Sequence, residues 1–285
     1  MALSARVPSG ADTAGFVPEI WSNLVLESVH NQLVCWDCID SRWQSDLKKG
    51  DTVNLGVTNT VTATEVVVGS KASSTDPASG SKIALVVNQW YEAPVDIDYM
   101  TIRQSQIDWA AQAQRESAYA VGKRMDTTVA TLFSSLGGGT YPNSDGATLD
   151  DDTLLSLVET LDEADVPRDG QRYLIIDPSA LVDLLKIDKF IAAQYVNIGA
   201  VTNGMVGNTP VYACNVRVTN NLVAATTGSY GVMMHRQAIA GAAQMEPSWV
   251  KEFEDLHLRR YQAEALWGVK EVRDTFGKAF YTRSA

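Results

Sequence analysis

Alternation of apolar and polar residues predicts two β-strands in the first third of the chain. Every second residue is apolar in two runs, Val53, Leu55 and Val57, then Ile83, Leu85 and Val87. This two-residue period is that of a strand with one buried face. The polar stretch "GSKASSTDPASGS", residues 69–81, joins the runs as a flexible tip. We expect a long hairpin with strands of about ten residues, lying against the body or another subunit, because an isolated two-stranded hairpin is only marginally stable.

A period of three and four residues predicts helices elsewhere. The longest such stretch runs from Asp96 to Leu136, has no proline, and carries one apolar stripe: Ala118, Val121, Met125, Val129 and Leu132. A single helix of this span would be about 55–60 Å long at about 1.5 Å per residue, longer than a compact domain needs. "FVPEIWSNLVLESVHNQLV", residues 16–34, predicts a short amphipathic helix that starts near Pro18 and follows a small, polar arm.

A helix, a strand and a second helix are predicted between residues 150 and 190. "DDDT" at Asp150 caps a helix to about Ala164, whose expected buried face is Leu154, Leu155, Val158 and Leu161. The strand Tyr173–Ile176 follows and ends at Asp177-Pro178. Enzymes often present a catalytic carboxylate at a strand end, but that role needs a partner acid, base or metal ligand. We favour the local interpretation, in which Asp177 and Pro178 begin a helix.

Composition narrows the classes of function. The 285 residues allow one large domain or two smaller ones. The net charge of −11 argues against tight DNA binding, which needs clustered Lys and Arg. The N-terminus lacks the apolar core of a secretory signal, and no apolar run is long enough for a membrane helix. Three cysteines, Cys35, Cys38 and Cys214, argue against a disulfide framework and for a reducing cytosol.

Candidate chemical motifs are weak. Cys35-Trp36-Asp37-Cys38 has C-x-x-C spacing, but it follows no strand, and a zinc site would need His30 and Cys214 to come together by folding. Two buried cysteines beside a packing tryptophan are the favoured interpretation. "GAVTNGMVG", Gly199–Gly207, has the glycines of a phosphate-binding loop without its lysine, which favours a surface loop. No G-x-S-x-G motif is present, and His30, His235 and His257 fall in no catalytic motif.

The order of segments resembles the major capsid proteins of tailed bacteriophages with the Hong Kong 97-type fold. "FVPEIWSNLVLESVHNQLV" looks like the N-terminal arm of that family, and "LKKGDTVNL" like the start of its extended loop. "VDIDYMTIRQSQIDWAAQAQRESAYAVGKRMD" is similar to its long spine helix. "LVETLDEADVPRDGQRYLIIDPSALVDLLKIDKF", "GNTPVYACNVRVTNNL" and "GVMMHRQAIAGAAQ" are similar to its axial domain. No single motif carries the resemblance, which spans about 260 residues in a shared order.

The resemblance implies an α+β capsid fold in five parts. These are an N-terminal arm with a short helix (1–50), a β-hairpin extended loop (51–95), a peripheral domain with the spine helix (96–148), an axial domain (149–245), and C-terminal strands returning to the peripheral domain (246–285). It implies pentamers and hexamers that form an icosahedral head shell around the double-stranded DNA genome, without catalysis, cofactor or metal. An encapsulin-type compartment shell shares the fold and is the alternative; a cytosolic enzyme using Asp177 or the cysteine pair is a third.

Implied partners are other copies of the chain, a portal, and scaffolding or decoration proteins, with no membrane. Assembly would occur in the host cytoplasm and the product would be the virion capsid. The arm begins near residue 16, which leaves no room for the long scaffolding segment of some family members. Some members cross-link through a loop lysine, but Lys71 and Lys82 come with no matching asparagine signature. The residues expected to make assembly contacts are Lys71, Asp76, Lys82, Val201 and Asn203.

Overall fold

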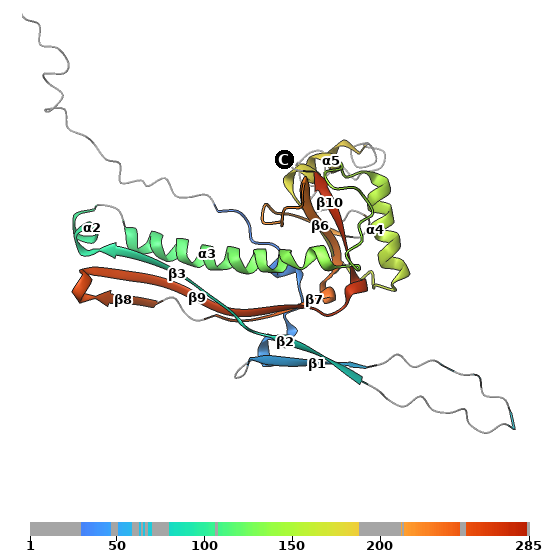
Figure 1. The fold of residues 1–285 in the computed structure, drawn as a ribbon, viewed down its shortest axis with the longest axis horizontal. Helices are drawn as coiled ribbons and strands as arrows, with labels where there is room; N and C mark the ends of the chain where they lie inside the picture. The colour runs from blue at the N-terminus through green and yellow to red at the C-terminus, as the bar shows by residue number, and fades with distance from the viewer. Residues whose placement is uncertain are drawn as a thin grey trace, which may run out of the picture.

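The computed structural model describes residues 30–46, 51–58, 80–105, 108–187, 214–245 and 249–283, together with residues 63, 65, 68, 69 and 212. Over these residues the chain is a mixture of helices and antiparallel sheet, with one parallel strand pair. A long helix lies along an elongated sheet, a rounded lobe stands at one end of that helix, and a hairpin projects from the other side of the sheet (Figure 1).

The predicted hairpin is confirmed over its described residues. Strands β1 (Thr52–Thr58) and β2 (Gly80–Val86) pair antiparallel along seven residues each. Leu55 and Leu85 are buried against β7, as the alternating pattern requires. The hairpin therefore has one apolar face on the body, while its polar face is exposed.

The elongated sheet has the strand order β3-β9-β7, with β8 also paired to β9. Its strands are β3 (Gln89–Asp98), β7 (Ile239–Met245), β8 (Trp249–Phe253) and β9 (Leu258–Glu271). Helix α3 (Trp109–Thr131) lies along β3 and β9 (Figure 1). Val121 and Met125 of the predicted stripe pack on Trp267, whose side chain is fully buried.

The predicted continuous helix from Asp96 to Leu136 is wrong. Residues 89–98 instead form β3, which pairs with ten residues of β9. A short helix α2 (Tyr99–Gln104) follows, α3 begins only at Trp109, and the 3-10 turn η4 (Phe133–Ser135) comes after it. Two aspartates set these starts: Asp98 accepts a 2.6 Å hydrogen bond from the Thr101 amide, and Asp108 accepts one of 3.2 Å from the Ala111 amide.

The lobe is a second sheet with helices on one face. Its order is β10-β6-β4-β5, formed by β4 (Arg172–Ile176), β5 (Asn215–Val218), β6 (Gly228–His235) and β10 (Gly277–Arg283). Leu174 and Ile176 face helices α4 (Asp151–Glu163) and α5 (Pro178–Lys186). Ile175 points to the opposite face and packs with the end of α3. The lobe and the spine helix thus share one core.

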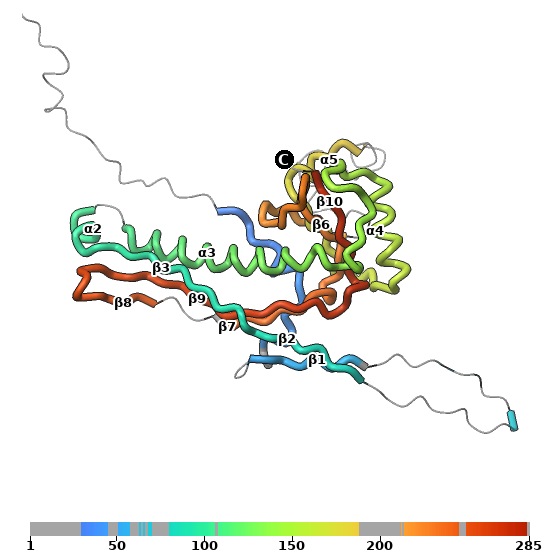
Figure 2. Tube along the Cα trace, viewed as in Figure 1, coloured from blue at the N-terminus to red at the C-terminus, as the bar shows by residue number. Residues whose placement is uncertain are grey.

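The chain passes between the two sheets near its C-terminal end. After β6 it leaves the lobe through the turn η6 (Arg236–Ala238) and joins the elongated sheet as β7, and after β9 it returns through η8 (Asp274–Phe276) to pair with β6 as β10 (Figure 2). The C-terminal strands therefore contribute to both sheets. Another 3-10 turn, η7 (Glu254–Leu256), connects β8 to β9.

Two local expectations need correction. On α4 the buried residues include Leu154, Leu157 and Leu161, while Leu155 is 41% exposed, because the helix turns its Leu157 side toward the sheet. The predicted N-terminal helix lies mostly outside the described residues, but its last five residues, 30–34, are not helical. They run along α3, where the amide of Asn31 donates a 3.0 Å hydrogen bond to the Tyr119 hydroxyl.

Candidate assembly interface

Asp177 is the N-cap of helix α5. Its Oδ1 accepts a 2.9 Å hydrogen bond from the Ala180 amide, and Pro178 occupies the first turn. Its Oδ2 lies 2.7 Å from the hydroxyl of Ser179. The carboxylate is buried and its hydrogen bonds serve the helix. The predicted helix start is confirmed. Both hydrogen bonds of the Asp177 carboxylate go to residues in the first turn of α5, and neither partner is an acid, a base or a metal ligand.

The C-x-x-C pair packs in the core. Cys35 and Cys38 are free thiols with almost no exposed surface, in a turn η2 (Trp36–Cys38) that packs on α3 and the lobe. Burial raises the pKa of Cys38 to about 12 and raises that of Cys35 well above its ordinary value. Reactive thiols have lowered pKa values instead. The favoured interpretation, buried cysteines beside a tryptophan, is confirmed.

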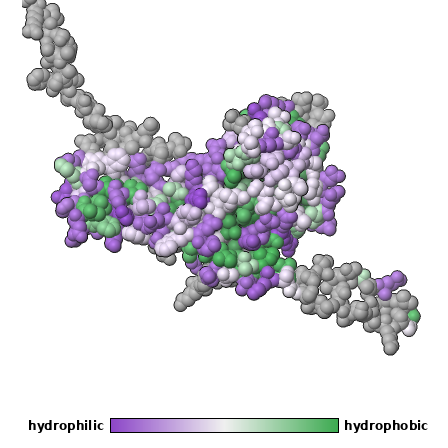
Figure 3. Space-filling view, viewed as in Figure 1, coloured by the Kyte–Doolittle hydropathy of each residue, from purple (hydrophilic) through white to green (hydrophobic). Residues whose placement is uncertain are grey.

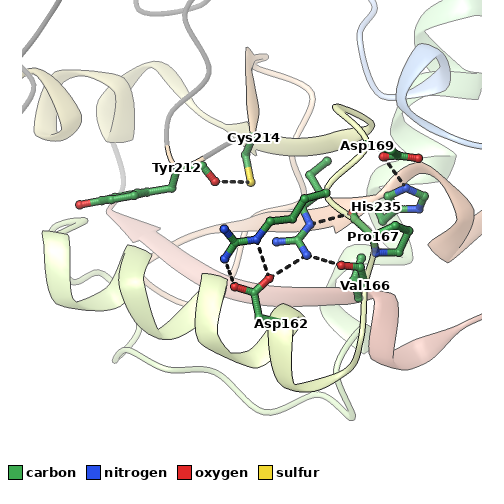
Figure 4. A network of polar contacts seen from close by, with 9 residues as sticks. Asp162, Val166, Pro167, Asp169, Tyr212, Cys214 and His235 are labelled. Atoms are coloured by element: carbon green, nitrogen blue, oxygen red, sulfur yellow. Dashed lines mark hydrogen bonds and ion pairs between the residues drawn. The ribbon is translucent and has the colours of Figure 1, made fainter.

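A buried arginine organises the "LDEADVPRDGQR" segment. Arg172 begins β4 with a fully buried side chain, and its Nη2 donates a 2.8 Å hydrogen bond to Oδ1 of Asp162 near the end of α4 (Figure 4). Arg172 also donates to the backbone carbonyls of Val166 and Pro167. Arg168 binds Asp162 as well, and these hydrogen bonds lower the pKa of Asp162 to about 2. The cluster fixes the turn between helix and strand.

The buried carboxylate of Asp126 joins three segments that are far apart in the sequence. Asp126 of α3 has no exposed surface, and its Oδ1 accepts hydrogen bonds from the amides of Cys35 at 2.6 Å and Trp36 at 3.2 Å. Its Oδ2 accepts a 2.9 Å hydrogen bond from Asn221. Sequence reasoning missed this residue. The available signal was a charged residue beside Met125 of the apolar stripe, but its partners are 90 or more residues away.

The described residues give no sign of a metal centre or membrane helix. No group of three or more His, Cys, Asp or Glu side chains in the described part of the chain has metal-binding geometry. Buried His235 contacts Asp169 at 3.1 Å, while His30 stacks on Tyr119 of α3. No helix among the described residues is long and apolar enough to cross a membrane.

Large apolar side chains are exposed on the elongated sheet and its ends. Figure 3 shows hydrophobic patches at the far end of the elongated sheet and around the base of the hairpin. Trp90 on β3 is 70% exposed, and Met100 and Leu256 at the far end are 67% and 65% exposed. Exposed tryptophans and methionines of this size are typical of protein-binding surfaces. Sequence reasoning did not single out these three residues.

Only one of the five predicted contact residues lies within the described part of the chain. Lys82 is exposed on β2, opposite Gly56 of β1. The other four lie outside the described residues: Lys71, Asp76, Val201 and Asn203. The loop predicted at Gly199–Gly207 also lies outside them.

Solved structures of phage capsids have this fold. A Mycobacterium phage Che8 structure matches with a TM-score of 0.80 and 22% identity, over 93% of this chain and 97% of that one. The capsid of Cyanophage P-SCSP1u matches with a TM-score of 0.76 and 15% identity, over 99% and 97%. A Gordonia phage Cozz structure gives 0.71 and 12%, over 99% and 97%. The fold is thus the Hong Kong 97-type capsid fold that the resemblance implied.

A family model described as phage capsid protein matches residues 87–276, about two thirds of the chain, and the chain belongs to that family. A comparison with curated proteins found no match. Family and fold together identify a major capsid protein, whose place is the virion capsid, and they favour it over the encapsulin-type alternative.

Proposed function

We propose that this protein assembles with copies of itself into pentamers and hexamers, which form an icosahedral shell around a double-stranded DNA genome. The observation that carries the proposal is the phage capsid family match over residues 87–276 on a Hong Kong 97-type fold. Heterologous contacts between identical subunits close into rings, and rings tile a shell. Many modest contacts then add up to a stable particle.

The exposed apolar residues support a role in subunit contacts. An isolated monomer would leave Trp90, Met100 and Leu256 in water, which favours association. The β1–β2 hairpin also leaves Val57 and Val86 36% and 42% exposed, and neighbouring subunits would cover these side chains. Lys82, Lys71 and Asp76 would then contact a neighbour through this extended loop, and Val201 and Asn203 through the axial loop.

The five-part division follows the two sheets after three adjustments, the first of which moves residues 89–95 from the extended loop to the peripheral sheet. We assign α3 and the β3-β9-β7 sheet to the peripheral domain, and the β10-β6-β4-β5 sheet with α4 and α5 to the axial domain. Residues 239–245 then belong with the peripheral sheet and residues 277–283 with the axial sheet. Residues 51–58 and 80–86 form the base of the extended loop.

The role is structural and does not require catalysis. The net charge of −11 is compatible with a shell that encloses DNA without binding it tightly, because tight binding needs many Lys and Arg contacts to phosphates. A portal and scaffolding or decoration proteins are the further partners we propose, with assembly in the host cytoplasm before the virion forms.

Negative-stain electron microscopy of the recombinant protein after size-exclusion chromatography tests the proposal. We expect uniform shells, or stable five- and six-membered rings. Deletion of residues 70–82 should leave the circular dichroism spectrum almost unchanged and abolish normal shells. A protein that stays monomeric at high concentration, with candidate scaffold proteins added, would refute the assembly proposal. Normal shells from the deletion would refute the role of the loop.

A further inference from the structure

A cleft opens where the start of β3, the last turns of α3 and the lobe meet. It has a volume of about 620 Å³ and includes Trp90 and Tyr91 from β3, Arg124 and Thr131 from α3, and residues 221–223 from the lobe. Arg124 is the only charged residue among the described residues that line it. We call this feature the Arg124 cleft.

The guanidinium of Arg124 is held in place by a neutral partner. Its Nη2 donates a 2.9 Å hydrogen bond to the hydroxyl of Tyr91, and its Cζ lies over the Tyr91 ring, 4.8 Å from the centroid. No carboxylate of a described residue forms an ion pair with this exposed side chain. Trp90 stands at the same cleft and is 70% exposed. The cleft therefore offers a positioned cation beside an apolar ring, which together fit a segment with a carboxylate and an apolar side chain.

The turn η7 between β8 and β9 has the complementary chemistry. Its three residues, Glu254, Asp255 and Leu256, are all exposed, and Leu256 is 65% exposed. Neither carboxylate forms an ion pair with a described residue. The turn lies at the end of the elongated sheet that is farthest from the lobe (Figure 1). It therefore presents two carboxylates and one apolar side chain at a protruding end of the molecule.

The η7 turn cannot reach the Arg124 cleft of its own chain. Asp98, at the end of β3, is paired with Leu258, two residues after the turn, whereas Trp90 lies near the start of β3. The eight residues from Trp90 to Asp98 span about 27 Å at about 3.4 Å per residue, and pairing with β9 along all ten residues of β3 maintains that separation. A second copy can supply the turn. Such a contact joins two different surfaces of identical subunits, which is the heterologous type that closes into rings.

We propose that the η7 turn of one copy inserts into the Arg124 cleft of the next, with Glu254 and Asp255 directed to Arg124 and Leu256 packed against Trp90. The inference rests on the proposed self-assembly and names the two surfaces of one of its contacts. Opposite charges select this pairing, and a carboxylate paired with arginine in a partly desolvated cleft contributes more than an exposed ion pair does. Contact between Leu256 and Trp90 removes both apolar side chains from water.

Charge reversal in the full-length chain tests the inference. The cleft variant carries Arg124→Glu, and the turn variant carries Glu254→Arg with Asp255→Arg. Each variant alone places like charges at the contact, so its yield of shells and rings should fall at least about tenfold. A chain with all three substitutions pairs opposite charges again and should regain shells. In an equal mixture of the two variants, charges match only between unlike copies. The mixture should therefore form six-membered rings, in which the copies alternate, and no five-membered rings. Light scattering and negative-stain microscopy measure both results.

Lys123→Glu is the matched control. Lys123 is exposed beside Arg124 on α3 but does not line the cleft, so the same change of charge should leave assembly at the wild-type level. Circular dichroism confirms that each variant is folded. Defective assembly of the cleft variant alone would show that the cleft binds another segment, and would overturn the pairing with η7. Failure of both the triple substitution and the mixture to assemble, while wild type assembles, would overturn it as well. A wild-type protein that stays monomeric would instead refute the proposed function.

Discussion

Asn221 donates a 2.9 Å hydrogen bond from Nδ2 to Oδ2 of Asp126, a residue 95 positions earlier in the chain. The other carboxylate oxygen accepts the amides of Cys35 and Trp36. One buried side chain of the spine helix thereby holds both the segment that follows the N-terminal arm and the loop that leads into β6.

Replacing Asp126 by alanine should strongly destabilise the fold. Three buried or half-buried donors would lose their acceptor, and a single unsatisfied buried group costs about 1–3 kcal/mol. We expect the free energy of unfolding in urea to fall by at least about 2 kcal/mol. Asp37→Ala is the control, since Asp37 is exposed and should change stability by no more than about 0.5 kcal/mol. Equal losses from both variants would contradict the role of Asp126.

Stability at acidic pH should depend on Asp162. Hydrogen bonds from Arg168 and Arg172 lower the pKa of Asp162 from 3.8 to about 2 in the folded protein. A lowered folded pKa means that its contribution is complete above about pH 4 and is lost as the pH falls toward 2. Asp162→Asn should therefore reduce the free energy of unfolding by about 1–3 kcal/mol near pH 7, and the two proteins should converge near pH 2.

Asp165→Asn is the matched control for the acid experiment. Asp165 is exposed, has a φ of 54°, and stands three residues after Asp162. Asparagine tolerates that left-handed backbone, so the variant should follow the wild-type curve. A constant difference between Asp162→Asn and wild type from pH 7 to pH 2 would contradict the assignment.

The three cysteines should be unreactive in the folded protein. Burial raises the pKa of Cys38 to about 12 and that of Cys214 to about 11, and it raises the pKa of Cys35 well above its ordinary value. Thiolate is the reactive form, so labelling at pH 8 should be at least about 100-fold slower than in denaturant. An Ellman titration, with and without guanidinium chloride, measures this. Rapid labelling of the native Cys35–Cys38 pair, or stoichiometric zinc in the purified protein, would revive the enzyme hypothesis.

Gly268 should determine how closely the β1–β2 hairpin packs against β9. A Cβ at this position of β9 would lie 2.1 Å from the carbonyl oxygen of Val86, which is backbone and cannot turn aside. Gly268→Ala should therefore displace the hairpin, lower stability by about 1–3 kcal/mol, and reduce the yield of normal shells. Gly56→Ala in β1 is the control, because its Cβ would meet no atom within 4 Å. Thermal unfolding and shell counts by microscopy provide the readout, and wild-type behaviour of Gly268→Ala would refute the close approach.

Short-range patterns predicted the elements that depend on neighbours in the sequence. Alternation located both strands of the hairpin, and Asp150 and Asp177 marked the starts of α4 and α5 because an N-cap acts on amides three residues away. The same reasoning failed between Asp96 and Ser105. There β3 continues to Asp98 because it pairs with β9, more than 150 residues later, and that pairing outweighs the local helix preference.

The sequence by itself determined the β1–β2 hairpin, the lobe helices and the order of segments that indicated a capsid protein. Only the tertiary structure decided which polar residues are buried with partners, such as Asp126 and Arg172, and which large apolar residues, such as Trp90, remain in water. The reason is physical: periodicity reports the direction of a side chain relative to its own element. Burial depends on which distant element covers that side, and hydrogen bonds such as that between Asp126 and Asn221 form only after the chain has brought both residues together.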